Sequence, residues 1–386
     1  MTAQPVESAE PVAAPRLDLD RILADPGVRI IVCGGSGGVG KTTTAAALAL
    51  RAAEQHGRRT VVLTIDPARR LAQSLGLTEL DNTPRPVKGV ESTGGSLHAM
   101  MLDMKRTFDE VVLAHTDPAR AQEIFANPFY QAMSSTFSGT QEYMAMEKLG
   151  QLHAEGDWDL IVVDTPPSRS ALDFLDAPAR LGRFLDGKML RVLLAPARAG
   201  GRSIFGLVTA SFSMFSRVVQ KVLGAQLLTD LSGFIAALDS MFGGFRTRAE
   251  ETYRILQAGE TAFLVVASPE PDAVREAAFF ARRLGEEAMP LAGLLLNRVH
   301  TTTVELSAER SLGAAVELDK LGGHEITAEA LRVHAALSDL VAREQRVAGA
   351  FTREFPAVPT VPVPAQPADV HDVDGLRAIG AAISLS

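Results

Sequence analysis

Short apolar runs rich in β-branched residues alternate along the chain with longer stretches of helical character. Seven such runs are expected to be strands: 29–33, 60–65, 97–102, 160–164, 262–267, 291–297 and 358–363. Several are apolar along their whole length, which is typical of strands buried on both faces of a parallel sheet. Strands separated by helices form βαβ units, so the pattern predicts an α/β fold with a doubly wound, mostly parallel sheet.

Two long insertions interrupt this alternation, at about 104–156 and about 176–258. The second contains an uncharged apolar stretch, but the stretch is too short to cross a bilayer and charges return after it, which indicates amphipathic helix. Residues 1–27 are rich in proline, alanine and acidic side chains and predict a disordered tail. We therefore expect one domain over 28–380, with two helical insertions.

The first predicted strand runs into a glycine-rich segment with the spacing of a phosphate-binding loop. Residues 34–43 read GGSGGVGKTT and satisfy G-x-x-x-x-G-K-[ST]. Glycines let successive backbone N–H groups point at phosphates, and the N-terminus of the following helix attracts the same anion. Lys41 is expected to reach the β- and γ-phosphates of a nucleotide, and Thr42 to ligate Mg²⁺. The expected nucleotide-binding residues of the loop are Gly35, Gly37, Gly38, Val39, Gly40, Lys41, Thr42 and Thr43.

Two carboxylates stand at the ends of predicted strands. Asp66 follows the run 60–65, and Asp164 ends the run 160–164. Because the carboxyl ends of parallel strands face one crevice, both can lie near the phosphate loop. There a carboxylate can hold Mg²⁺ or its bound water, or orient the attacking water. Either residue alone could instead cap a helix; together with the loop, the pair favours catalysis.

Composition excludes several classes of protein. The 386 residues carry 38 basic and 46 acidic side chains, a net charge of −8, and are 46% hydrophobic and 22% charged, so a disordered or fibrous chain is excluded. The acidity argues against nucleic acid as a partner. With one cysteine, no secretory pattern and no apolar run of 18 residues, we expect a cytoplasmic protein, either free or peripheral at a membrane. Cys33 is interpreted as a core residue.

These motifs resemble those of a known family. The S-G-G-V-G-K-T-T loop, the run Asp66-Pro67-Ala68-Arg69-Arg70-Leu71 and Asp164-Thr165-Pro166-Pro167 resemble the deviant-Walker P-loop ATPases, and among them the arsenite-pump ATPase ArsA and the tail-anchored-protein targeting ATPases. Ser268-Pro269-Glu270, Leu296-Asn297 and the closing VPVPAQPADVHDVDGL fit the same group. The resemblance covers most of 28–380, and the long second insertion is similar to that of the bacterial paired ArsA-like ATPases of the BagAB type.

The resemblance implies roles for single residues. Asp66 matches the aspartate that polarises the hydrolytic water, Asp164 the aspartate near Mg²⁺, and Asn297 an asparagine that hydrogen-bonds adenine, although Asn297 could also be an ordinary turn residue. Asp66 and Lys41 are then candidate catalytic residues, and Thr42, Asp66 and Asp164 candidate metal ligands. The family also implies ATP and Mg²⁺ as cofactors, and an ATP-hydrolysing dimer whose nucleotide state moves a helical client-binding region.

The chain departs from the family pattern at Ser36. Deviant-Walker loops normally carry a lysine there that reaches the partner's phosphates across a dimer, and such a cation strongly accelerates phosphoryl transfer. A heterodimer with a lysine-bearing sister subunit would restore it; a homodimer would lack it in both sites unless an arginine substitutes. The family's CxxC zinc clamp and paired arsenite-binding cysteines are also missing, so neither ligand is expected.

The second insertion suggests a partner surface. The segment Phe205–Phe245 contains six phenylalanines, both ends included, and Arg180–Arg254 contains 11 basic and 5 acidic residues. The apolar residues suit binding of a hydrophobic or membrane-protein client, and the basic residues suit an acidic partner or a membrane surface. Alternatively, the apolar residues simply pack on the core. Other functions remain open: a nucleotide-binding regulatory subunit that stabilises a catalytic sister, a ParA/MinD-type positioning ATPase, and a small-molecule kinase. The ending GLRAIGAAISLS lacks the basic amphipathic helix that a positioning ATPase needs.

Overall fold

The computed structural model describes residues 15–65, 70–77, 79–91, 94–128, 130–131, 140–166 and 247–385. The chain divides into two compact units. The first comprises residues 1–100, 158–171 and 256–386, and the second comprises 101–157 and 172–255. The bounds proposed for the two insertions remain predictions. The apolar segment Phe205–Phe245 lies outside the described residues.

An eight-stranded sheet forms the centre of the first unit, in the order β3-β4-β2-β5-β1-β6-β7-β8. Its strands are β1 (Ile30–Gly35), β2 (Arg59–Thr64), β3 (Arg85–Pro86), β4 (Ser96–Met101), β5 (Leu160–Asp164), β6 (Thr261–Ala267), β7 (Leu291–Val299) and β8 (Thr360–Pro364). β1 pairs in parallel with β5 and β6, and the pairs β2–β5, β6–β7 and β7–β8 are also parallel. The predicted α/β fold with its mostly parallel sheet is confirmed, and each of the seven expected strands is present.

The middle of the sheet is buried on both faces. Every residue of β1, β5 and β6 is buried, which accounts for their uninterrupted apolar runs. The short strand β3 pairs antiparallel with β4 at the edge of the sheet and was not predicted. It has only two residues, and its proline is tolerated because the strand lies at an edge.

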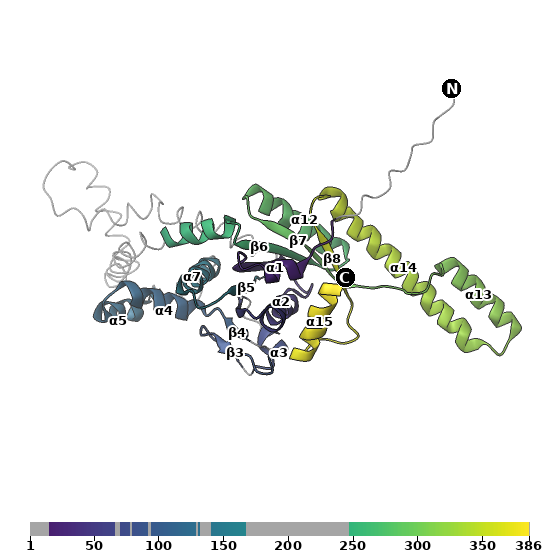
Figure 1. Cartoon of the computed structure of the whole chain (residues 1–386), viewed down its shortest axis with the longest axis horizontal. Coiled ribbons are helices and arrows are strands. Elements are labelled where there is room, and N and C mark those ends of the chain that lie inside the picture. Colours follow the sequence, from purple (N-terminus) through teal and green to yellow (C-terminus); the bar gives the residue numbers. More distant parts are fainter. Residues whose placement is uncertain are drawn as a thin grey trace, which may run out of the picture. The chain divides into compact units, whose positions relative to one another are not determined.

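Helices flank the sheet and extend from it. The first unit contains α1 (Leu19–Ala24), α2 (Lys41–His56), α3 (Arg70–Ser74), α12 (Pro271–Glu286), α13 (Ala308–Leu321), α14 (Glu325–Glu354) and α15 (Val373–Leu385). α2 packs against β1, β2 and β5, while α12 packs against β1 and β6. α13 and α14 form a helical hairpin whose far end extends away from the sheet (Figure 1). Within the described ranges, no helix is long and apolar enough to cross a membrane.

The assignment of residues 1–27 to a disordered tail is wrong for 15–27. α1 begins after Asp18, whose side chain accepts a hydrogen bond from the Arg21 amide, and its leucines Leu19 and Leu23 are buried. Asp20 pairs with Arg51 of α2 at 2.7 Å, and this guanidinium holds the pKa of the Asp20 carboxyl well below its usual range. Because α1 has only six residues, its stability depends on this tertiary contact, which local composition does not reveal. Residues 1–14 lie outside the described residues.

The second unit contains α4 (Met104–His115), α5 (Pro118–Ala126), α7 (Thr140–Glu155) and helical residues at 247–255, which continue to 257 in the first unit. Polar contacts tie these helices together. Lys148 of α7 pairs with Glu110 of α4 at 3.2 Å, and Arg248 pairs with the buried Glu147 at 2.9 Å. A carboxylate as buried as Glu147 is stable only with such a partner.

Candidate functional site

The loop between β1 and α2 has a backbone that only glycine accommodates. Gly38 and Gly40 have φ of +80° and +91°, in the left-handed region. A Cβ on Gly35 would lie 2.1 Å from the Val266 carbonyl oxygen, and one on Gly40 would lie 2.3 Å from Asn297 Nδ2. The loop therefore turns tightly against β6 and β7, as a phosphate-binding backbone requires.

Lys41 is the first residue of α2 and turns back over this loop. Its Nζ donates to the Ser36 carbonyl oxygen at 2.6 Å, and the residue is buried. The helix is preceded by Gly40, which provides no side-chain cap, and Thr42 and Thr43 follow in the first turn. The helix N-terminus and the lysine thus place positive charge on the same loop, which is the electrostatic requirement for binding a phosphate.

Asp164 ends β5, directly beside the strand that leads into the loop. It pairs in register with Cys33 of β1 and is fully buried. Its Oδ2 accepts a hydrogen bond from Thr64 Oγ1 at 2.9 Å, so the end of β2 orients this carboxylate. Asp164, Thr42 and Lys41 come from neighbouring elements at the carboxyl edge of the sheet, where the sequence analysis placed them.

Cys33 lies at this edge but is enclosed in the core. The residue is fully buried, which raises the pKa of its thiol, and the negative charge of Asp164 raises it further. A thiol that stays protonated is a poor nucleophile and a poor metal ligand. The interpretation of Cys33 as a core residue is confirmed.

Asn297 joins β7 to the loop, a role that the sequence analysis missed. Its Nδ2 donates to the Val39 carbonyl oxygen at 2.8 Å, and its Oδ1 accepts from the Arg298 amide at 3.0 Å. An asparagine amide has two N–H donors and two acceptor lone pairs, so one of each is left after these two bonds. Contact with an adenine is compatible with this geometry and stays a prediction.

Asp66 lies outside the described residues, so its predicted catalytic and metal-binding roles stay predictions. Two further residues shape the site without having been singled out. Thr64 holds Asp164, and Gly34 makes room for Phe280 of α12, whose ring a Cβ there would approach to 2.3 Å. The role of Thr64 could have been suspected, because a threonine stands near the end of an apolar strand. No local feature of the sequence indicated the role of Gly34.

The donor groups suit a magnesium nucleotide. Thr42 and Asp164 offer the hydroxyl and carboxylate oxygens that Mg²⁺ prefers, while Lys41 and the start of α2 suit the phosphates. Ser36, at the position where the deviant-Walker motif has lysine, is 8% exposed. Such a short and buried side chain supplies no cation to a second subunit.

Comparison with known proteins gives a consistent picture. A family model described as anion-transporting ATPase matches residues 28–314, which is most of the chain. Among curated proteins, the chain is 28% identical over 184 residues to the ATPase GET3 of Malassezia globosa, which covers 48% of this chain and 51% of that protein.

Two other relatives match over similar lengths. An ATPase ASNA1 homolog of Paramecium tetraurelia is 31% identical over 160 residues, 42% of this chain and 47% of that protein. A putative arsenical pump-driving ATPase of Prosthecochloris vibrioformis is 31% identical over 158 residues, 40% of this chain and 36% of that protein. The chain thus spans about half the length of the first of these relatives.

Proposed function

Because the chain belongs to the anion-transporting ATPase family, we propose that it binds ATP with Mg²⁺ at the loop between β1 and α2 and hydrolyses it. The observation that carries this proposal is the position of Lys41. Its ammonium donates to the Ser36 carbonyl oxygen over a glycine backbone that continues into the N-terminus of α2, and Asp164 ends the strand that pairs with β1. This arrangement supports a phosphate site near a magnesium ligand, the minimum that a P-loop ATPase needs.

Each residue then has a distinct task. The loop amides and Lys41 bind the β- and γ-phosphates and stabilise the negative charge that develops on them. Thr42 and Asp164 would hold Mg²⁺, with Thr64 fixing the Asp164 carboxylate; the bound ion neutralises phosphate charge. Asp66, which follows β2, is proposed to position the attacking water, and the hydrolysed γ-phosphate leaves as inorganic phosphate.

ATP turnover and nucleotide binding by two variants test this proposal. Lys41→Ala removes the phosphate-binding ammonium, so we expect nucleotide affinity to fall about ten- to a hundredfold. Asp66→Asn keeps the shape of the side chain, so we expect binding to persist while turnover falls about a hundredfold or more. Lys105→Ala, an exposed lysine of α4, is the matched control. Unchanged turnover in Asp66→Asn would reject the role given to that residue.

A sister subunit is the partner that we propose for this site. The buried Ser36 supplies no cation to another subunit, so two copies of this chain would lack the lysine that acts across deviant-Walker dimers. A sister that carries this lysine would complete the site of the present chain. The test is the native mass of the complex co-purified from the source cells, together with turnover at increasing concentrations of the isolated chain. Turnover that rises with concentration, with only homodimer present, would contradict the proposal.

ATP turnover of the co-purified complex, with and without Asp66→Asn in this chain, distinguishes a regulatory subunit from a catalytic one. If the co-purified complex hydrolyses ATP and Asp66→Asn in this chain abolishes half or more of the turnover, this chain is catalytic. If the variant complex keeps full turnover while this chain still binds nucleotide, the chain is a regulatory subunit. The client-binding role proposed for the second insertion rests on the segment Phe205–Phe245, which lies outside the described part of the chain.

A further inference from the structure

Exposed apolar side chains gather on one part of the first unit. Of the eight large apolar residues that are strongly exposed among the described residues, six lie in the α13–α14 hairpin or the segment before it: Val304, Leu312, Val316, Leu321, Ile326 and Val333. Single exposed apolar residues need no explanation, but a cluster marks an interaction surface. Ile326 is 88% exposed and Val333 63%, so no part of the first unit that the structure describes covers them.

The periodicity of α14 defines the shape of this surface. One stripe runs along the helix at alternating spacings of four and three residues: Ile326, Ala330, Val333, Leu337, Leu340, Glu344, Val347 and Phe351. This is the repeat of a coiled coil. The second half of the stripe is covered by other parts of the first unit. Phe351 is buried where α14 packs on α12, and Glu344 accepts a hydrogen bond from the His300 amide at 2.9 Å. The first half of the stripe is bare, since α13 packs on the opposite face through Ala328 and Ala335.

Charged residues beside the stripe indicate which partner helix can bind to its exposed half. Glu329 and Arg343 occupy equivalent flanking positions two heptads apart, about 21 Å along the helix. Arg343 forms no ion pair with the described residues, and Glu329 pairs only with Arg332, one turn away on the exposed surface. In an antiparallel pair of identical α14 helices, Val333 of one copy packs on Leu337 of the other. That register places Glu329 of each copy beside Arg343 of the other, so the surface is self-complementary.

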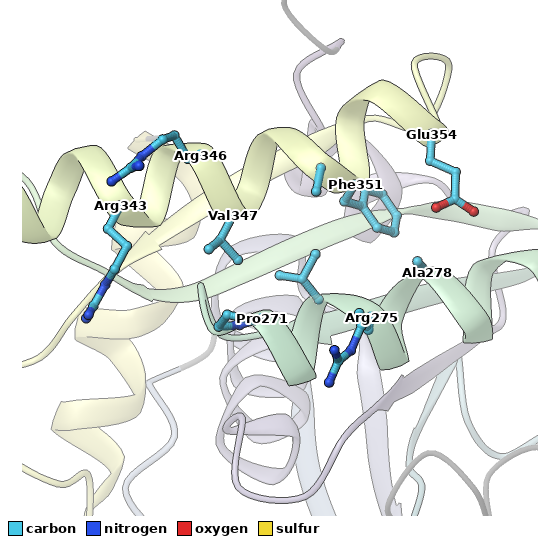
Figure 2. A pocket seen from close by; sticks show the side chains of 10 residues that line it. Pro271, Arg275, Ala278, Arg343, Arg346, Val347, Phe351 and Glu354 are labelled. Atoms are coloured by element: carbon cyan, nitrogen blue, oxygen red, sulfur yellow. The ribbon is translucent and has the colours of Figure 1, made fainter.

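In this antiparallel arrangement, the tip of the α13–α14 hairpin of one copy would reach a groove on the other copy. It has a volume of about 500 Å³ between α12 and α14, with Val274, Val347 and Phe351 among its apolar lining and Arg275, Arg343 and Arg346 around it. Figure 2 shows Arg343, Val347 and Phe351 following one another along α14, opposite Pro271 and Ala278 of α12. The same antiparallel register brings the exposed Leu321, at the tip of the hairpin, to the level of Val347 and Ala350.

We propose that a second copy of this chain docks antiparallel on the N-terminal half of α14, with the tip of each hairpin at the α12–α14 groove of the other copy. The contact is independent of nucleotide and separate from the loop between β1 and α2. It does not rest on the proposed ATPase activity. One helix pair buries a small area, so we expect a dissociation constant on the order of 10 μM.

Sedimentation velocity of the full chain, in EDTA and without nucleotide, tests the contact. We expect a reversible monomer–dimer equilibrium. Val333→Asp places a charge in the centre of the helix pair and should weaken association at least about tenfold. Leu113→Asp, a similarly exposed leucine on α4, is the matched control and should leave association unchanged. A chain that stays monomeric at every concentration, or a dimer that Val333→Asp does not weaken, overturns the proposal.

A charge exchange tests the antiparallel register. Glu329→Arg and Arg343→Glu each bring like charges together twice per dimer, so each variant alone should associate about tenfold more weakly. An equimolar mixture of the two variants restores both opposite-charge pairs, so a heterodimer of near wild-type affinity should form. The double variant in a single chain should also recover. If the mixture and the double variant stay as weak as the single variants, α14 does not pair in this way, and its bare face belongs to a partner of another sequence.

Discussion

Small residues serve different purposes at the loop edge of the sheet and in the α13–α14 hairpin. At the loop, glycines stand where a Cβ would collide with backbone or with Asn297, and Lys41, Asp164 and Asn297 all hydrogen-bond within the unit. In the hairpin, small residues such as Ala328 and Ala335 bring two helices together, while Ile326 and Val333 point outward. The first region is complete within one unit and leaves a site for a small anion. The second buries too little of its apolar surface and is suited to a macromolecular partner.

The largest effect is expected from adding one methyl group to each region. Gly35→Ala would place Cβ 2.1 Å from the Val266 carbonyl oxygen, at a φ of +151°, so the free energy of unfolding should fall by about 3 kcal/mol or more. Gly313→Ala meets open space inside helix α13 and should raise it by up to about 1 kcal/mol. Urea unfolding followed by circular dichroism measures both. Equal losses in the two variants would show that the hairpin is packed as tightly as the loop.

Two glutamates of α14 give a smaller contrast within one helix. Glu344 is buried, its carboxylate accepts a hydrogen bond from the His300 amide, and Oε1 lies 2.8 Å from Nδ1 of the His300 ring. Glu344→Ala should therefore cost about 1–3 kcal/mol of stability. Glu329 is exposed and, among the residues that the structure describes, pairs only with Arg332, so Glu329→Ala should cost less than about 0.5 kcal/mol. Unfolding at low micromolar concentration, where dimers are scarce, compares the two. A larger loss from Glu329 would mean that the first half of α14 is covered even in the monomer.

The smallest expected effect concerns nucleotide selection at the loop. Asn297→Ala removes a hydrogen bond to the Val39 carbonyl oxygen, worth about 1 kcal/mol, so ATP affinity should fall about fivefold. If the remaining polar groups of Asn297 contact adenine, GTP affinity should fall less than ATP affinity. Equilibrium titration with both nucleotides decides between these roles. An equal loss for ATP and GTP would show that Asn297 acts only by holding the loop.

The strands and the phosphate loop could be predicted because their signals are local. A run such as 160–163 is apolar throughout because both faces of β5 are covered, and the loop needs glycines and a lysine at fixed spacing. The prediction failed where an element depends on a distant surface. α1 is too short to be stable alone, and β3 is a two-residue edge strand, so neither leaves a periodic pattern.

Pairings within the site were beyond local analysis for the same reason. Thr64 and Asp164 are 100 residues apart, and Asn297 and Val39 are 258 apart, yet each pair is joined by a hydrogen bond. Only the order of strands in the sheet brings them together. A threonine at the end of a strand or an asparagine after one has many local uses, and its actual partner depends on which strand lies next to it.

The sequence by itself determined the α/β class, the seven main strands and a loop that suits phosphate, because backbone preference and hydrophobic period act over a few neighbouring residues. Only the tertiary structure decided which polar groups meet at the end of the sheet. It also decided that half of the α14 stripe is buried against α12 and β7 while the other half is bare. A helix of uniform period carries no sign of where its covering ends, because burial depends on neighbours that lie far away along the chain.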